Sequence, residues 1–356
     1  MYLKHLYYIG ALNFIMRGFL MEKLIKMCCL NSVSGNEFKM TEYIKKYTES
    51  FCDNIVTDNS GNVIAFLNND SDVNIALEAH MDNIGLVVKE IDENGFIKFI
   101  TVGGIDSSVL PTAEVIVHGK KDLYGVIGAK PPHLQTNEDK NKKSTVENMY
   151  IDCGYDFENM SKFVSVGDTI SLISSFDPLK SDFFTSGSLD NRIGCYIVSE
   201  CLKRLKTKKI NYNVSGVFSV QEEVGCRGAK KAIYTAKPDI AVIVDVTFGI
   251  SPYTDDEHGF KVGDGVTLAV GPNLDRRLTN KLMQLCDENN ISYKKEICSD
   301  HTGTDAWPIQ MACDGIRCIL LSVPIKYMHT TVEVAHKKDI EDAINIICIA
   351  LEGGIL

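Results

Sequence analysis

The sequence of 356 residues lacks the excess of basic side chains that a nucleic-acid-binding surface needs. It has 37 Lys and Arg against 47 Asp and Glu, and its formal net charge at pH 7 is −10. Affinity for nucleic acid comes largely from clustered Lys and Arg that neutralise phosphates. We therefore expect no nucleic-acid partner.

The twelve cysteines include no CxxC pair, which argues against a thiolate-rich structural zinc site. They are scattered through apolar runs, as Cys195, Cys201, Cys318 and Cys348 illustrate. In a chain of this length, such thiols are typical of reduced core residues. We therefore predict a cytoplasmic protein without disulfide bonds.

No uncharged apolar run reaches the roughly 18 residues that a membrane span requires. The first twenty residues are apolar and aromatic, but Lys4, His5 and Arg17 interrupt them, and RGFLMEKL is a poor signal-peptide cleavage site. We predict neither a membrane anchor nor a membrane partner. Because MEKLIKMCCL opens an amphipathic helix at Met21, we expect the native chain to begin there, with residues 1–20 as an extension.

Apolar segments and amphipathic helices alternate along most of the chain. Nearly continuous apolar segments such as VNIALEAHM and DIAVIVDV are typical of strands buried on both faces of a parallel sheet. Segments such as FKMTEYIKKYTESF and DNRIGCYIVSECLKRL repeat apolar residues at helical spacing. We predict an α/β domain, with helices on both faces of a mostly parallel sheet, built from residues 21–87 and 181–356.

The segment between these two parts follows another pattern. Short strands such as AEVIVHGK and DTISLIS are broken by Gly, Pro and Asp, with no convincing helix. We predict a small all-β domain, PDZ-like or barrel, inserted over residues 88–180. Its polar run QTNEDKNKKSTVEN mixes both charges and is most simply a solvated loop.

Seven acidic and imidazole side chains follow the ends of predicted strands or precede a predicted helix. They are His80, Asp82, Asp190, Glu222, Glu223, Asp245 and His329. Because the carboxyl ends of parallel strands meet at one edge of a sheet, where open α/β sheets bind ligands, we expect these side chains to gather there. The result would be five carboxylates and two imidazoles at one rim.

Such a cluster needs cations. Carboxylates within about 4 Å of one another in a partly buried site cannot all stay ionised unless cations neutralise them. Ligands drawn from His, Asp and Glu suit zinc, cobalt or manganese in a hydrolytic site. Two ions about 3.5–4 Å apart need a bridging carboxylate, an imidazole and a carboxylate for each ion, and a base for the water between them. The seven residues meet that demand.

Taken singly, each residue has a simpler interpretation. Asp190 suits a helix N-cap, His80 suits a hydrogen-bonded core histidine, and Asp245 suits the start of a turn. The adjacent Glu222 and Glu223 suit a solvated turn, although the strand before them is apolar and the glycine after them indicates a tight loop. The combination, and no single member, points to a metal site.

Longer motifs carry a family resemblance. They are AHMDNIGLVV, TVGGIDSSVLPTAEVIVHGK, GVIGAKPPH, GSLDNRIGCY, VQEEVGCRGA, IVDVTF, GTDAWPIQ and PIKYMHTTVEVA. In this order they resemble the tetrahedral aminopeptidases, metallopeptidase family forty-two, from about Met21 to the C-terminus. Members of that family are known as glutamyl, leucyl or deblocking aminopeptidases, and sometimes as endoglucanases.

The resemblance implies a role for each of the seven residues. One ion would be held by His80, Asp190 and Asp245, and the other by Asp190, Glu223 and His329, with Asp190 bridging. Glu222 would be the general base, and Asp82 would orient His80. The two divalent ions would be zinc or cobalt, with manganese as an alternative.

The resemblance also implies an activity and an assembly. The enzyme would hydrolyse the N-terminal peptide bond of short peptides with a free N-terminus, using a water that lies between the ions and is activated by Glu222. The inserted β domain would serve assembly into a homo-oligomer, commonly a hollow tetrahedron of twelve subunits.

Three other functions remain open on these residues. A metal-dependent amidohydrolase or deacylase of small amides would use the same side chains and would not require a free α-amine. An endoglucanase would use two carboxylates without metals and aromatic faces for the sugar, but Trp307 is the single Trp. A non-catalytic binding protein is disfavoured because every ligand and the base are present.

Two departures from the family concern the substrate. Asn83 stands where the family usually has an acidic residue, and His301 and Trp307 lie near the segment expected to line the substrate pocket. They leave the preferred N-terminal residue open, and the sequence decides neither the metal nor the number of subunits.

Overall fold

The computed structural model describes residues 21–135, 145–254 and 259–354. The predicted extension over residues 1–20 lies outside the described residues. All twelve cysteines lie inside them and are free, which confirms the prediction of unpaired thiols. Among the described residues, no helix combines the length and apolar character that a bilayer span needs.

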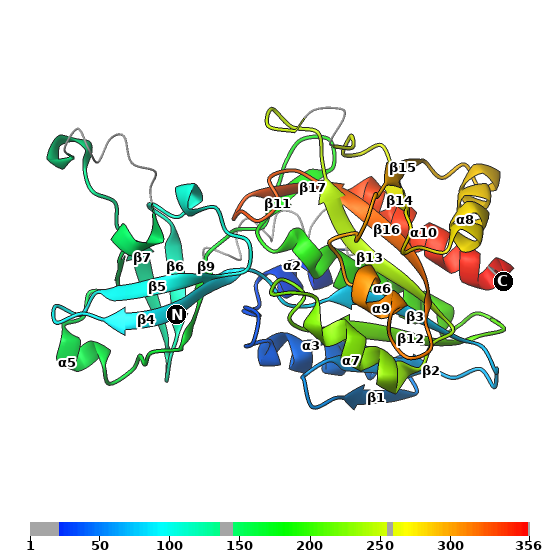
Figure 1. The fold of residues 1–356 in the computed structure, drawn as a ribbon, viewed down its shortest axis with the longest axis horizontal. Helices are drawn as coiled ribbons and strands as arrows, with labels where there is room; N and C mark the ends of the chain where they lie inside the picture. The colour runs from blue at the N-terminus through cyan, green and yellow to red at the C-terminus, as the bar shows by residue number, and fades with distance from the viewer. Residues whose placement is uncertain (1–20, 136–144, 255–258, 355–356) are drawn as a thin grey trace.

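An eight-stranded sheet forms the larger part of the molecule (Figure 1). Its strands, in the order in which they lie side by side, are β1 (Asn54–Thr57), β2 (Val63–Leu67), β12 (Asn213–Ser219), β3 (Asn74–His80), β13 (Ile240–Phe248), β16 (Arg317–Ile325), β14 (Val266–Val270) and β15 (Tyr293–Ile297). The central strands β12, β3, β13 and β16 are parallel. Antiparallel pairings join β1 to β2, β2 to β12 and β14 to β16. The prediction of a mostly parallel sheet is confirmed.

Helices cover both faces of this sheet, as the apolar strands require. One face packs against α2 (Glu22–Cys28), α3 (Phe38–Thr48), α6 (Leu189–Leu205), α8 (Arg276–Glu288) and α10 (Lys337–Gly353). The other face packs against α7 (Arg227–Ala236) and α9 (Ala306–Gln310). Successive side chains of β3 point to opposite faces of the sheet. Leu77 therefore packs in the core on the first face and Ala76 in the core on the second.

A closed six-stranded barrel lies beside the sheet (Figure 1). Around the barrel its strands are β4 (Gly85–Ile91), β5 (Ile97–Val102), β8 (Ile151–Asp152), β7 (Asp122–Ile127), β6 (Glu114–His118) and β9 (Thr169–Leu172). Inward and outward residues alternate in β7, which is typical of a small barrel filled by side chains. The barrel confirms the predicted second, all-β fold.

The barrel segment also holds short helical turns that its Gly- and Pro-broken pattern did not predict. They are η1 (Ser107–Val109), η2 (Pro132–Leu134), η3 (Val146–Asn148) and α5 (Phe157–Met160). Each is one turn long, too short for helical periodicity to show in the sequence. Asp156 caps α5 by accepting a hydrogen bond from the backbone N of Asn159.

A small antiparallel sheet follows the barrel and returns the chain to the larger domain. Its strands are β10 (Asp177–Pro178), β11 (Phe183–Ser186) and β17 (Glu333–His336). β11 pairs with β17 from Phe183 opposite His336 to Ser186 opposite Glu333. This pairing brings the loop before β17 close to the start of α6.

The centre of β3 allows a test of the sheet core. Leu77 is fully buried, so Leu77→Ala leaves a cavity between the sheet and its helices, and we expect the free energy of unfolding to fall by about 2–5 kcal/mol. Urea denaturation measures this loss. Leu179→Ala is the matched control, because Leu179 is 46% exposed and should change stability by less than about 1 kcal/mol. Equal losses in the two variants would contradict the packing described above.

Candidate metal centre

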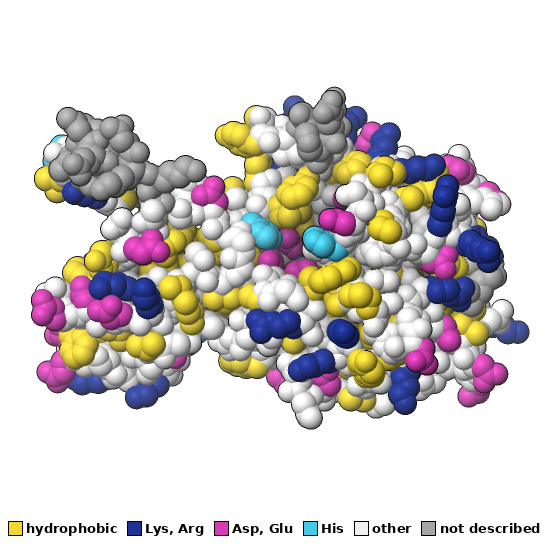
Figure 2. All heavy atoms as spheres, in the orientation of Figure 1, with side chains coloured by type: hydrophobic (Ala, Val, Ile, Leu, Met, Phe, Trp, Pro, Cys, Tyr) yellow, Lys and Arg dark blue, Asp and Glu magenta, His cyan; other side chains and the backbone are white. Residues whose placement is uncertain are grey.

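The carboxyl ends of the central strands converge on one hollow. Figure 2 shows Asp and Glu side chains gathered between His side chains in a depression of the surface. β3 ends at His80, beside Ser219 at the end of the parallel strand β12. Asp245 lies on the next strand, β13, and α6 carries Asp190 in its first turn. The sheet topology thus brings residues far apart in sequence to one edge.

One group of potential ligands lies on the sheet and the start of α6. His80 Nε2 is 3.2 Å from Asp190 Oδ1 and 3.7 Å from Asp245 Oδ1. All three residues are buried, and one ligand atom from each lies within 4.8 Å of the others. These three side chains could hold one metal ion.

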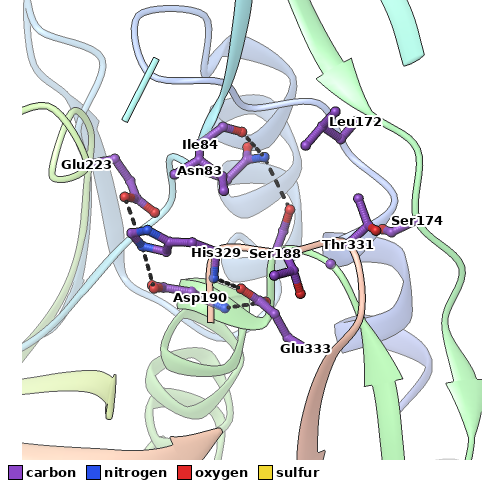
Figure 3. A pocket seen from close by; sticks show the side chains of 12 residues that line it. Asn83, Ile84, Leu172, Ser174, Ser188, Asp190, Glu223, His329, Thr331 and Glu333 are labelled. Carbon is purple, nitrogen blue, oxygen red and sulfur yellow. Dashed lines mark hydrogen bonds and ion pairs between the residues drawn. The ribbon is translucent and has the colours of Figure 1, made fainter. Parts of the chain in front are cut away.

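A second group uses the other oxygen of Asp190. His329 Nε2 is 3.4 Å from Asp190 Oδ2 and 3.3 Å from Glu223 Oε2. Figure 3 shows dashed lines that join the His329 ring to Glu223 and to Asp190. The two groups therefore share Asp190, and each uses a different oxygen of its carboxylate.

Both groups fit a divalent transition metal. Ligand atoms at about 2.1 Å from a tetrahedral zinc ion are about 3.4 Å apart, close to the spacing observed here. Imidazole and carboxylate donors suit zinc, cobalt and manganese alike. Each group also offers three protein ligands, which leaves a position for water or substrate, as in catalytic sites.

Asp82 holds the two glutamates in place beside these groups. Its Oδ1 accepts a hydrogen bond from the backbone N of Glu222 at 3.0 Å, and its Oδ2 accepts one from the backbone N of Glu223 at 3.2 Å. Asp82 Oδ1 also lies 3.5 Å from His80 Nδ1, an ion-pair contact without hydrogen-bond geometry. Asp82 therefore holds the glutamate turn through two hydrogen bonds and contacts His80 without one.

The turn itself explains why two glutamates stand side by side. The backbone N atoms of Gly225 and Cys226 both donate to the carbonyl of Glu222, and Gly225 has φ +112°, which glycine adopts without strain. Glu223 then lies in the second ligand group, while Glu222 is left out of both. Glu222 Oε1 instead accepts a hydrogen bond from Cys226 Sγ at 3.2 Å.

Burial and the negative charges of the cluster raise the pKa values of several of its side chains and so favour their protonated forms. Burial, reinforced by Asp245, Asp305 and Asp190 against the opposing effect of His80, raises the pKa of Glu222 to about 9. Burial and the Asp190 charge likewise raise the pKa of Glu223 to about 8. A hydrogen bond to Asp190 raises the pKa of His329 to about 10. Cations would take the place of these protons.

Sequence reasoning missed Glu333, which is 2% exposed and lies at the start of β17. Its Oε2 accepts hydrogen bonds from the backbone N of Leu189 at 2.6 Å and of Asp190 at 3.3 Å. Its Oε1 accepts one from the backbone N of His329 at 2.9 Å. Glu333 thus ties together the segments that carry two ligands. Its position in MHTTVEVA, four residues after His329, was the available signal.

Asp305 was also missed, although it lies in the quoted motif GTDAWPIQ. It is buried, and its Oδ2 lies 2.8 Å from Ser219 Oγ, which also lies 2.7 Å from Oε1 of Glu78. The single hydroxyl hydrogen of Ser219 can be donated to only one of the two carboxyl groups at a time. One atom of Asp305 lies within 4.8 Å of ligand atoms of Glu222 and Cys226. Burial raises the pKa of Asp305 to about 6. A polar network therefore continues beneath Glu222.

A pocket opens on the His329 side of the centre (Figure 3). Its lining comes from both domains, with Ile84 and Leu172 at the ends of barrel strands and Ser188 and Thr331 from the larger domain. Asn83, the first departure from the family, lines it too and donates to Ser188 Oγ at 3.2 Å. The pocket wall beside the ligands is thus mainly uncharged.

The second departure, His301 and Trp307, lies within four residues of Asp305 in the sequence. The rings of His301 and Trp307 are 5.4 Å apart, and Trp307 is 43% exposed. Trp307 follows Asp305 by two residues in α9, so the pair lies near the network beneath Glu222. His301 and Trp307 are not among the residues that line the pocket beside His329.

Comparisons with known proteins bear on this site. A family model described as M42 glutamyl aminopeptidase matches residues 61–346. The lysyl aminopeptidase of Pyrococcus furiosus is 31% identical over 340 residues, which is 94% of this chain and 96% of that protein.

Two solved structures are similar over nearly the whole chain. A TET aminopeptidase from a marine sediment archaeon of the Thaumarchaeota has a TM-score of 0.88 at 27% identity, with 93% of this chain and 95% of that chain covered. The TET1 peptidase of Pyrococcus horikoshii, which can assemble into a tetrahedron or a large octahedral shell, has a TM-score of 0.83 at 31% identity, with 93% and 99% covered.

The pKa shifts predict that metal binding releases protons. At pH 7 the metal-free chain holds protons on Glu223, with a pKa of about 8, and on His329, with a pKa of about 10, and both must leave before these atoms can bind an ion. The apparent metal affinity should therefore rise with pH from 6 to 8. Calorimetry with zinc in two buffers of different ionisation enthalpy measures the release. Binding heats that are independent of buffer would contradict this assignment.

Proposed function

The chain belongs to the M42 glutamyl aminopeptidase family, and on that premise we propose that it is a dinuclear aminopeptidase whose general base is Glu222. As a member of the family it is a metal-dependent aminopeptidase, a hydrolase of peptide bonds. The observation that carries the proposal is the pair of ligand groups that meet at the two oxygens of Asp190, with Glu222 beside them and outside both.

Each of the seven residues has a place in this proposal. His80 and Asp245 would hold one ion, Glu223 and His329 would hold the other, and Asp190 would contact both. Two divalent ions at these positions would polarise the first peptide carbonyl and lower the pKa of an attacking water. Zinc or cobalt suits the donor set, with manganese as an alternative.

Glu222 is the residue proposed to move the proton. It accepts the proton of the attacking water and delivers it to the departing amine, which requires a carboxylate near the ions that is not itself a ligand. Asp82 supports this role, because its hydrogen bonds to the backbone N atoms of Glu222 and Glu223 fix the position of the turn. Asp82 also lies against the Nδ1 side of His80, where it orients the ring.

The proposed substrates are short peptides with a free N-terminus. A metal-dependent amidohydrolase or deacylase remains the alternative, since the same ligands and base would serve it. An endoglucanase has less support, because the carboxylates lie at ligand distances from two imidazoles instead of flanking a sugar cleft.

Assembly and location extend the proposal. Because the TET1 peptidase of Pyrococcus horikoshii can assemble into a tetrahedron, we propose a homo-oligomer, with a tetrahedral dodecamer as the expected form. The inserted domain at residues 88–180, which contains most of the barrel, would serve this assembly. Twelve unpaired cysteines suit the cytoplasm. Native mass spectrometry of the purified protein measures the number of chains.

One peptide pair tests the activity. We expect chelator-treated protein to be inactive, and addition of zinc, cobalt or manganese to restore release of the first residue from a short peptide with a free N-terminus. The same peptide with an acetylated N-terminus should remain intact. Cleavage of both peptides would favour the amidohydrolase, and cleavage without metal would overturn the metal-dependent mechanism.

Glu222→Gln tests the general base. The amide cannot accept the proton, so we expect kcat to fall by roughly 100- to 10,000-fold while both ions remain bound. Peptide hydrolysis and metal analysis of the same sample measure the two effects. Glu49→Gln, at an exposed position, is the matched control and should behave as the unaltered protein. A Glu222→Gln protein with a nearly normal rate would refute the assignment.

A further inference from the structure

The barrel contacts the metal centre through one turn. Gly103 and Gly104 follow β5 at the end of the barrel that faces the larger domain. The carbonyl oxygen of Gly104 lies 2.8 Å from Nδ1 of His329, 225 residues further along the chain. A carbonyl oxygen can only accept, so Nδ1 carries the hydrogen, and the lone pair of the neutral ring lies on Nε2. Nε2 is the atom that faces Asp190 and Glu223.

A side chain on Gly104 would crowd the His329 ring. A Cβ added there would lie 3.0 Å from Nδ1 and 3.2 Å from Cε1 of His329. The neighbouring Gly103 has φ +79°, and a Cβ on it would lie 2.7 Å from a methyl group of Ile84 and 3.5 Å from Cβ of Glu223. The turn is therefore packed against two of the three ligands of the Asp190–Glu223–His329 group.

The backbone of His329 is held separately from its ring. Its φ is +63°, in the left-handed region, and its backbone N donates to Glu333. The His329 side chain is 31% exposed, so packing within the larger domain leaves part of the ring unsupported. The Gly104 carbonyl at Nδ1 therefore sets the direction of the ring together with the contacts of Nε2 to Asp190 and Glu223.

The other ligand group has no such dependence on the barrel. The side chain of His80 is 2% exposed at the end of β3, and its neighbours Asp190 and Asp245 come from α6 and β13. All three belong to the larger domain. The two groups therefore differ in what supports them.

We propose that the Gly103–Gly104 turn of the barrel is a positioning element of the metal centre, which holds His329 in the tautomer and direction needed to bind an ion. The proposal rests on the two-ion centre proposed above. It makes occupancy of the Asp190–Glu223–His329 group depend on the barrel, while the His80–Asp190–Asp245 group binds its ion without it.

Gly104→Ala tests this element. The added methyl pushes the His329 ring away, so we expect affinity for one of the two ions to fall by about 10- to 100-fold, as is typical when a group that orients a metal-bound histidine is altered. Metal titration followed by calorimetry measures both affinities, and the absorption spectrum of the cobalt-loaded protein reports the loss of an imidazole ligand. Affinity for the other ion should stay unchanged.

Gly128→Ala is the matched control. Gly128 lies in the same barrel, and a Cβ on it would approach nothing closer than 4.0 Å. This variant should bind both ions as the unaltered protein does. Thermal unfolding of the two variants shows whether the barrel remains folded. If Gly104→Ala also bound both ions with unchanged affinity and spectrum, the turn would have no positioning role.

The His329→Ala variant distinguishes failure of the positioning role of the turn from failure of the two-ion centre. We expect it to retain one ion per chain, and the double variant with Gly104→Ala to be no weaker than His329→Ala alone, because the turn acts through the ring. An additional loss in the double variant would show that the turn acts elsewhere and would overturn the inference. If the unaltered protein itself bound fewer than two ions per chain, the dinuclear centre would fail independently of the turn.

Discussion

Repulsion among buried carboxylates at the carboxyl edge of the sheet is the constraint on which the rest of the structure depends. Asp190, Glu222, Glu223 and Asp245 are largely withdrawn from water and lie around two imidazoles. Burial disfavours the charged form of each carboxylate, and each negative neighbour disfavours it further. A site of this kind is stable only with protons or cations, and its donor atoms are spaced for cations.

The scaffold holds several of these groups through hydrogen bonds to the backbone of the segments that carry them. Asp82 and Glu333 accept hydrogen bonds from the backbone N atoms of the segments that carry Glu223, Asp190 and His329. Among the atoms that face the proposed ions, Asp245 Oδ1 also accepts a hydrogen bond from the backbone N of Val246 at 2.8 Å. Such support is needed because catalytic geometry tolerates little movement of its ligands.

A buried arginine side chain lies in the same region. Arg192 is fully buried, and its guanidinium donates to the carbonyls of Met81 and Leu30 and to Asn83 Oδ1. These hydrogen bonds join α6 to the segment that follows His80 and to the turn that follows α2. Asn83 therefore has a structural partner in this chain besides its place on the pocket wall.

Much of the fold could be predicted because its signals are local. Nearly continuous apolar runs such as the one that forms β13 indicate strands buried on both faces, and parallel strands fix the edge at which their carboxyl ends meet. The prediction of His80, Asp190 and Glu223 at one rim followed from that rule together with their residue types. One-turn helices such as α5 could not be predicted, since they are shorter than the helical repeat.

By itself, the sequence determined the sheet, its helices on both faces, and the acidic and imidazole side chains at the strand ends, because each of these depends on neighbouring residues. Only the tertiary structure decided which other residues position the proposed metal ligands. Glu333 reaches the backbone of Leu189 across 144 residues, and Gly104 reaches His329 across 225. Contacts between residues so far apart in the sequence leave no local pattern in it. They form only when the barrel, the sheet and the loop before β17 have packed together.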